Sequence, residues 1–248
     1  MTAEGASGTG WRTRLGPLIR TLGATTGIGL VIGVLVGGVG GRLAMRLLAL
    51  TSGPSATGVI SDDGFRIGQF SAATLNLLVT GALFGVVGSF TYLAVRPFLL
   101  GPSWLRALTC ALASGAVLGS IVVNPDGVDF TVLSPVWLAV ALFVAIPALF
   151  GALAPPAIER ALATGGWART APLRIVAAPL AVFLFPPLLI VLGIPVALVL
   201  GARWRLRRWP RIAHAARRPW SLWTARVGWA AVAILGLVAL AGDVSALR

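Results

Sequence analysis

The residues of this chain that could do chemistry are a few charged side chains set between long apolar segments. Arg42 and Arg46 are four residues apart, so on a helix both side chains lie on one face. Their candidate partners are the aspartates of the sequence, namely Asp62, Asp63, Asp126, Asp129 and Asp243. Guanidinium and carboxylate groups in this pattern predict a site for an anion or a lipid headgroup. The alternative is structural, an arginine pair at a membrane boundary that pairs with loop carboxylates.

Other catalytic constellations are absent from the sequence. His214 is the single histidine, so neither a haem pair nor a histidine-based metal site is expected. Cys110 lies in an apolar segment and is interpreted as a small hydrophobic residue rather than a nucleophile. No phosphate-binding loop of the Walker type occurs. The sequence therefore names no catalytic residue and favours a non-enzymatic protein without cofactor or metal.

The elements that must position these residues follow from the composition. The chain has 248 residues, of which 57% are hydrophobic and 11% charged, and its mean hydropathy is +0.93. A soluble domain carries about 25% charged residues, so this composition excludes a soluble enzyme and indicates a protein that uses the lipid bilayer as its solvent. The net charge of +13 comes from arginine alone. With abundant alanine and glycine, this is typical of a high-GC bacterial genome, and it predicts the bacterial cytoplasmic membrane.

Six uncharged or nearly uncharged segments are long enough to cross the membrane. A helix needs about 20 apolar residues to cross ~30 Å of hydrocarbon, and backbone groups in lipid require helices. The segments are Thr21–Gly41 with its continuation Leu43–Leu50, Ile67–Val95, Ala107–Pro125, Phe130–Ile158, Ile175–Ala202 and Val227–Leu247. We expect an all-α integral membrane protein, a bundle of five or six transmembrane helices. Residues 21–248 form its single domain, and residues 1–20 are expected to be a disordered tail.

Glycine spacing predicts how these helices pack. Glycines four residues apart lie on one helix face, and small residues allow the close backbone approach that holds helices together in lipid. The predicted packing glycines are Gly29, Gly33, Gly37 and Gly41 in the first helix, Gly81 and Gly85 in the second, and Gly115 and Gly119 in the third. The alternative is that a glycine-rich sequence supplies such spacing by chance.

Two loops carry Asp-Gly turn signals, at Asp63-Gly64 and at Asp126-Gly127. Asp-Gly between β-prone residues indicates a hairpin turn, and Asn124-Pro125 strengthens the second signal. We expect short β-hairpins or tight turns that cap the bundle. Because two full-length apolar segments separate the loops, both are expected on the same face of the membrane.

The C-terminal third of the sequence holds a strongly basic loop, residues 203–226. Such arginine density predicts a cytoplasmic location. The loop is either an interfacial helix on anionic lipid or a solvated basic segment. The residues expected at the lipid interface are Trp204, Arg207, Trp209, Arg211, Arg218 and Trp220. The segment before it, Ile175–Ala202, either spans once with a kink or enters and returns, turning at Pro186-Pro187. The re-entrant arrangement puts the two chain termini on opposite sides.

Three stretches of the sequence resemble uncharacterised polytopic membrane proteins of high-GC bacteria. They are Gly40–Arg46, Asp62–Phe65 and Asn124–Phe130. The resemblance implies no activity and transfers no functional residue. The expected function is a small membrane protein that passes or binds a small solute, or an accessory subunit of a membrane complex. Its expected partners are the bilayer with anionic headgroups, and other membrane subunits or a second copy, not nucleic acid. The alternative is an enzyme that acts on lipid headgroups through Arg42, Arg46 and the loop carboxylates.

Overall fold

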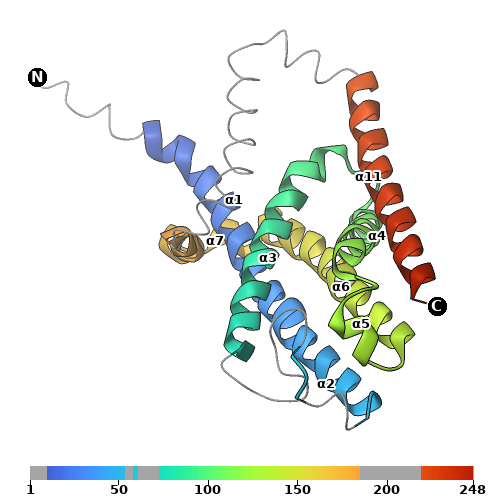
Figure 1. Cartoon of the computed structure of the whole chain (residues 1–248). Helices are drawn as coiled ribbons and strands as arrows, with labels where there is room; N and C mark the ends of the chain where they lie inside the picture. Colours follow the sequence, from blue (N-terminus) through green and yellow to red (C-terminus); the bar gives the residue numbers. More distant parts are fainter. Residues whose placement is uncertain (1–9, 54–57, 61–72, 185–218, 248) are drawn as a thin grey trace, which may run out of the picture.

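The computed structural model describes residues 10–53, 58–60, 73–184 and 219–247, and within these ranges the chain is all-helical (Figure 1). Five helices there are long and apolar enough to span a membrane. They cover Leu15–Thr51, Thr74–Phe98, Ser103–Val122, Val136–Thr170 and Arg226–Ala246. The predicted segment Ile175–Ala202 is described only at its start, where Leu173–Leu184 forms a shorter apolar helix. Its remainder, including Pro186-Pro187, lies outside the described residues.

The first candidate span changes its helical winding along its length. α1 (Gly10–Ile32) is α-helical, η1 (Gly33–Gly40) is a π-helix, and α2 (Gly41–Thr51) is α-helical again. A π-helix bonds each N–H to the carbonyl five residues back instead of four, and it is rare. The sequence of η1, GVLVGGVG, helps to explain its position, because glycine has little intrinsic preference for the α-helix.

The helix also begins earlier than the sequence predicts. A disordered tail is expected over residues 1–20, but α1 starts at Gly10, so that expectation is wrong from Gly10 onward. Arginine is a good helix former, so Arg12 and Arg14 continue the helix beyond its apolar stretch. Residues 1–9 lie outside the described residues.

The remaining elements are four long helices and several short helices that connect them. They are α3 (Ala73–Val95), η3 (Arg96–Phe98), α4 (Ser103–Val122), α5 (Val128–Val132), α6 (Val136–Leu162), α7 (Trp167–Thr170), α8 (Leu173–Ala177), η4 (Ala178–Leu184) and α11 (Pro219–Ala246). Pro102 and Pro135 precede α4 and α6, where a residue without an N–H costs the helix nothing. Gly101 has a φ of +83°, a conformation that favours glycine, and it turns the chain from η3 into α4.

One end of the bundle is closed by an apolar cluster from four helices and a loop. Leu48 of α2 packs there with Val123 and Phe130, and Leu240 of α11 and Leu247 just after it lie against the same cluster. We call this the aspartate end, after Asp126, Asp129 and Asp243. α2 and α11 both finish here.

The opposite end is held by arginine contacts. Arg20 of α1 donates hydrogen bonds of 2.8 and 2.7 Å to the carbonyls of Ala168 and Ala171, next to α7. Arg226 of α11 donates from Nε to the carbonyl of Phe98 in η3 at 3.2 Å. We call this the arginine end. α1 and α11 both begin there and run to the aspartate end, as the blue and red helices of Figure 1 show.

The glycines of the first helix lie directly against α3. A Cβ built on Gly29 would lie 2.7 Å from the carbonyl oxygen of Gly85, and one on Gly37 would lie 3.1 Å from the Cα of Gly81. Gly33 approaches the Gly81 carbonyl still more closely. Gly41 differs, because a Cβ there would make ordinary contact with Leu77 at 3.5 Å.

The third predicted pair of glycines packs against a different helix. A Cβ on Gly115 would lie 3.1 Å from Ala148 Cβ, and one on Gly119 would lie 2.9 Å from Val144 Cγ2, both on α6. The backbones of α4 and α6 therefore approach closely at the two glycines.

The second Asp-Gly loop forms a turn but not a hairpin. The Gly127 N–H donates to the carbonyl of Asn124 at 2.9 Å, which closes the expected tight turn. In place of the expected strand, the chain continues as the helix α5, so the hairpin prediction is wrong here. Asp129 lies in the first turn of α5, where a carboxylate interacts favourably with the helix dipole. The first loop lies outside the described residues from position 61, but Val59 just before it packs on the cluster at the aspartate end.

Candidate functional site

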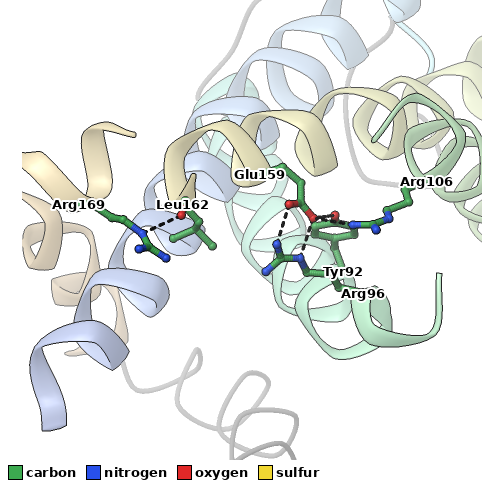
Figure 2. Close-up of polar contacts among 6 residues, drawn as sticks. All are labelled: Tyr92, Arg96, Arg106, Glu159, Leu162 and Arg169. Atoms are coloured by element: carbon green, nitrogen blue, oxygen red, sulfur yellow. Dashed lines mark hydrogen bonds and ion pairs between the residues drawn. The ribbon is translucent and has the colours of Figure 1, made fainter. Parts of the chain in front are cut away.

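Glu159, in the last turns of α6, gathers donors from two other helices at the arginine end. The Tyr92 hydroxyl donates to Glu159 Oε1 at 2.6 Å. Arg96 donates from Nε to Oε1 at 2.7 Å and from Nη2 to Oε2 at 2.6 Å. Arg106 of α4 donates from Nη1 to Oε1 at 3.4 Å. Figure 2 shows the two arginines reaching the carboxylate from different sides, with the Tyr92 ring between them.

Local sequence explains how α3 presents two of these groups together. Tyr92 and Arg96 are four residues apart, so they lie on one face of the helix that η3 continues. The two parallel bonds from Arg96 form the bidentate pairing that is the strongest geometry for an arginine and a carboxylate. Both carboxylate oxygens of Glu159 therefore accept hydrogen bonds from α3 and its continuation η3.

The cluster is partly withdrawn from solvent. Tyr92 is 4% exposed and packs with Cys110 and Ile158 in an apolar cluster just beneath the charges. The Glu159 side chain is 21% exposed, and those of Arg96 and Arg106 are 38% and 31% exposed. Removing one partner of a partly buried charge pair costs more than the pair contributes, because the remaining charge is left without compensation.

The arrangement favours an electrostatic role over a catalytic one. The carboxylate accepts from three side chains, so it is not available as a general base. One carboxylate faces two guanidinium groups, so the cluster as a whole is positive. Within the part of the chain that the structure describes, no group of three histidine, cysteine, aspartate or glutamate side chains could hold a metal ion.

Arg169 has a separate role near this cluster. Its Nε donates to the carbonyl of Leu162 at 2.9 Å, on the far side of α6 from Arg106 in Figure 2. Leu162 is the last residue of α6, so the guanidinium satisfies a carbonyl that the helix leaves free and meets the negative end of its dipole.

The structure places the arginine pair predicted from the sequence in a different setting. Arg42 Nη2 donates to Thr74 Oγ1 of α3 at 2.5 Å, and Arg46 is exposed. Asp126 is exposed in its turn, whereas Asp129 of α5 is 3% exposed. Asp243 is half-buried on α11, and Asp62 and Asp63 lie outside the described residues.

Tryptophans lie at both ends of the bundle. Trp104, at the start of α4, is 65% exposed and Trp223, at the start of α11, is 59% exposed, both at the arginine end. Trp137 begins α6 at the aspartate end and is also exposed. Such tryptophans are typical of the two interfaces of a membrane protein. Of the interface residues predicted in the basic loop, Trp220 lies in the first turn of α11, and Trp204, Arg207, Trp209, Arg211 and Arg218 lie outside the described residues.

Sequence reasoning misses the Glu159 cluster, although a signal for it is present. Arg96 directly follows one apolar segment, Arg106 directly precedes the next, and Glu159 directly follows the one after. In helices that alternate in direction, these three boundaries fall at one end of the bundle. The spacing of Tyr92 and Arg96 then marks the helix face that carries the donors.

Comparison with protein families, curated proteins and solved structures finds no match to this chain. The geometry of the described residues is therefore the basis on which a function can be assigned.

Proposed function

We propose that this chain is an integral membrane protein of the bacterial cytoplasmic membrane, and that it acts as a non-enzymatic accessory subunit of a membrane complex. The observation that carries the proposal is the separation of charge along five apolar helices. The described charged side chains lie toward the helix ends, and the middle of each candidate span is uncharged.

The charges also differ between the two ends, which supports an orientation. Nine described arginines belong to the arginine end, and two lie in α2 toward the aspartate end. The nine are Arg12, Arg14, Arg20, Arg96, Arg106, Arg160, Arg169, Arg174 and Arg226. Arginine is concentrated on the cytoplasmic side of membrane proteins. The arginine end therefore faces the cytoplasm, and the aspartate end faces the opposite side.

The directions of the helices bear on the fifth apolar segment. α8 follows α6 and α7 at the arginine end, and α11 begins at that same end. The start of the fifth apolar segment and the start of α11 therefore lie at the same end of the bundle. The turn predicted at Pro186-Pro187, which distinguishes a re-entrant segment from a single kinked span at Ile175–Ala202, lies outside the described residues.

The uncharged middle of the spans favours an accessory role over passage of a polar solute. A path for an ion or polar molecule is lined by hydrogen-bonding or charged groups. The described polar residues with fully buried side chains are small hydroxyls, Thr25, Thr26 and Ser89. The Glu159 cluster uses its groups on one another and ties three helices together. We assign it to assembly rather than transport.

The headgroup-active enzyme is less well supported. It requires a nucleophile or base beside Arg42 and Arg46. Arg42 donates a hydrogen bond to the hydroxyl of Thr74, and the carboxylates Asp62 and Asp63 that this reading invokes lie outside the described residues.

Two measurements on the full chain test the proposal. Reporters fused to Met1 and to Arg248 should show the N-terminus in the cytoplasm and the C-terminus outside, and the protein should stay in the membrane after alkaline extraction. Both termini on one side, or release by alkali, would contradict the membrane topology. Native mass spectrometry after purification in mild detergent should then show a stoichiometric second membrane subunit. A lone chain would overturn the accessory role, and a lone chain with a retained solute would point to solute binding.

A further inference from the structure

The register between α4 and α11 brings two arginines to one level. A Cβ on Gly236 would lie 3.0 Å from the Cα of Val117, and Leu240 Cδ2 would lie 3.6 Å from a Cβ on Gly119. Both helices run away from the arginine end, so they are parallel neighbours. Ten residues back from Gly236 is Arg226, and ten residues back from Ala116, whose carbonyl carbon also lies 3.0 Å from that Cβ, is Arg106, so the two arginines lie at about the same level. The bond from Arg226 to the Phe98 carbonyl, just before α4, agrees with this register.

The same interface contains a tryptophan whose indole faces α4. Trp229 precedes Gly236 by seven residues, which is two helical turns, so both lie on the same side of α11. Its indole Nε1 is buried and has no acceptor among the described residues. Trp229 lies three residues after Arg226, about one helical turn further along α11. It is therefore at the level of the α4 turn that follows Arg106. The indole N–H is thus an unused donor one turn from Arg226, on the side of α11 that carries Gly236.

A second donor at this level is also unused. Arg106 Nε is buried and has no acceptor in the part of the chain that the structure describes, although Nη1 of the same guanidinium reaches Glu159. Buried donors are almost always satisfied, so two orphans at one helix interface call for an acceptor that is not part of the described chain. Glu159 is already engaged by Tyr92 and Arg96 and does not fill this role.

The charge around these donors selects the kind of acceptor. Arg96, Arg106 and Arg226 bring three positive charges, and Glu159 brings one negative charge. The Arg226 guanidinium lies 5.4 Å from the centre of the exposed Trp223 ring, at the depth where tryptophans meet the membrane surface. An anion with several acceptor oxygens, at the level of lipid headgroups, matches both the charge and the position.

We propose that Arg106, Arg226 and Trp229 form a binding site for a phosphate group at the arginine end of the α4–α11 interface. Arg226 and Arg106 supply charge and N–H donors to the phosphate oxygens, and the Trp229 indole donates from the α11 side. The phosphate belongs either to an anionic phospholipid or to a free phosphate ion. The phospholipid source rests on the membrane location proposed above, whereas the ion source does not.

The test uses the full chain purified in mild detergent and freed of lipid. Native mass spectrometry measures binding of phosphatidylglycerol against a zwitterionic phosphatidylcholine background, and isothermal titration calorimetry measures binding of inorganic phosphate. Arg226→Gln removes a charged donor and should weaken binding at least about tenfold. Trp229→Phe keeps the ring and removes one neutral donor, so about a threefold to tenfold loss is expected.

Arg174→Gln is the matched control, because Arg174 is exposed at the same end of the bundle but lies on α8. It makes the same charge change and should bind as the unmodified chain does. Thermal unfolding of each variant separates lost binding from lost folding. Retention of phosphatidylglycerol alone assigns the site to lipid, and binding of inorganic phosphate with equal strength assigns it to the ion. The proposal is overturned if neither ligand binds, or if Arg226→Gln and Trp229→Phe bind as tightly as Arg174→Gln.

Discussion

The Tyr92 hydroxyl lies 2.6 Å from Glu159 Oε1, and this bond links the end of α3 to the end of α6 across 67 positions of sequence. Two arginines converge on the same carboxylate from η3 and α4. Three of the long apolar helices, α3, α4 and α6, are thus joined at one acidic side chain. The strength of this junction can be measured by changing one of its groups at a time.

Replacing Glu159 by glutamine should destabilise the protein by about 2 kcal/mol, because two partly buried guanidinium groups lose their counter-charge. The measurement is the midpoint of thermal unfolding in mild detergent. Asp126→Asn makes the same chemical change at an exposed turn and should leave the midpoint nearly unchanged. Equal effects of the two variants would contradict the role given to Glu159.

Replacing Tyr92 by phenylalanine should cost about 1 kcal/mol, the usual net contribution of one hydrogen bond. The ring keeps its packing against Cys110 and Ile158, and Glu159 keeps both bonds from Arg96. The hydroxyl acts through Glu159, so the same change should cost much less in a Glu159→Leu background, which offers no acceptor. Additive losses in this double-mutant cycle would show that the hydroxyl works elsewhere.

Replacing Gly85 by alanine should destabilise the α1–α3 interface by about 1–3 kcal/mol, the usual cost of overpacking. The new Cβ would lie 2.6 Å from the Cα of Gly33 and closer still to the carbonyl oxygen of Gly29. Gly228→Ala is the control, because a Cβ there meets nothing within 4 Å. That change should raise stability by up to about 1 kcal/mol, since alanine favours the helix. Thermal unfolding of both variants is the measurement, and a tolerated Gly85→Ala would rule out close backbone contact here.

Replacing Ser89 by alanine should leave stability unchanged or raise it by up to about 1 kcal/mol, because its hydroxyl is fully buried and has no partner among the described residues. Ser114→Ala should instead lower the stability of the protein. Ser114 Oγ donates to the carbonyl of Pro147 on α6 at 2.8 Å, and an interhelical bond of this kind contributes about 0.6 kcal/mol in a membrane. The midpoints of thermal unfolding of both variants give the comparison, and a loss at Ser89 would reveal an unrecognised partner.

The apolar spans could be predicted from sequence, and the candidate site only as far as the end of the bundle at which its charged residues meet. Length and hydropathy alone mark a spanning helix, so five of the six predicted segments overlap a candidate span. The direction in which a boundary charge points depends on how neighbouring helices pack. Arg42 and Glu159 both sit at the edge of an apolar segment, and nothing local says that Glu159 would face two arginines while Arg42 would face Thr74.

Turn signals in the sequence predict the turn itself but not the element after it. Asn124-Pro125-Asp126-Gly127 forms the expected tight turn, yet the next residues are helical. Val128 and Phe130 have high β-propensity, but a strand needs a partner strand, and the described residues around the turn offer helices. The surrounding helical bundle overrides local propensity at this loop.

The π-helix η1 divides the first candidate span into two α-helical parts whose faces are rotated relative to each other. Each wide turn of η1 holds one residue more than an α-turn would, so the faces of α2 are offset from those that α1 alone would project. Returning one such turn to α-helical winding would rotate α2 by roughly 100° about its axis, the angle of one residue in an α-helix. That rotation would swing Arg42 away from Thr74 while the contacts of Gly29 with Gly85 stayed in place. The helical winding of the eight residues of η1 therefore sets the direction in which Arg42 and Arg46 point relative to α1.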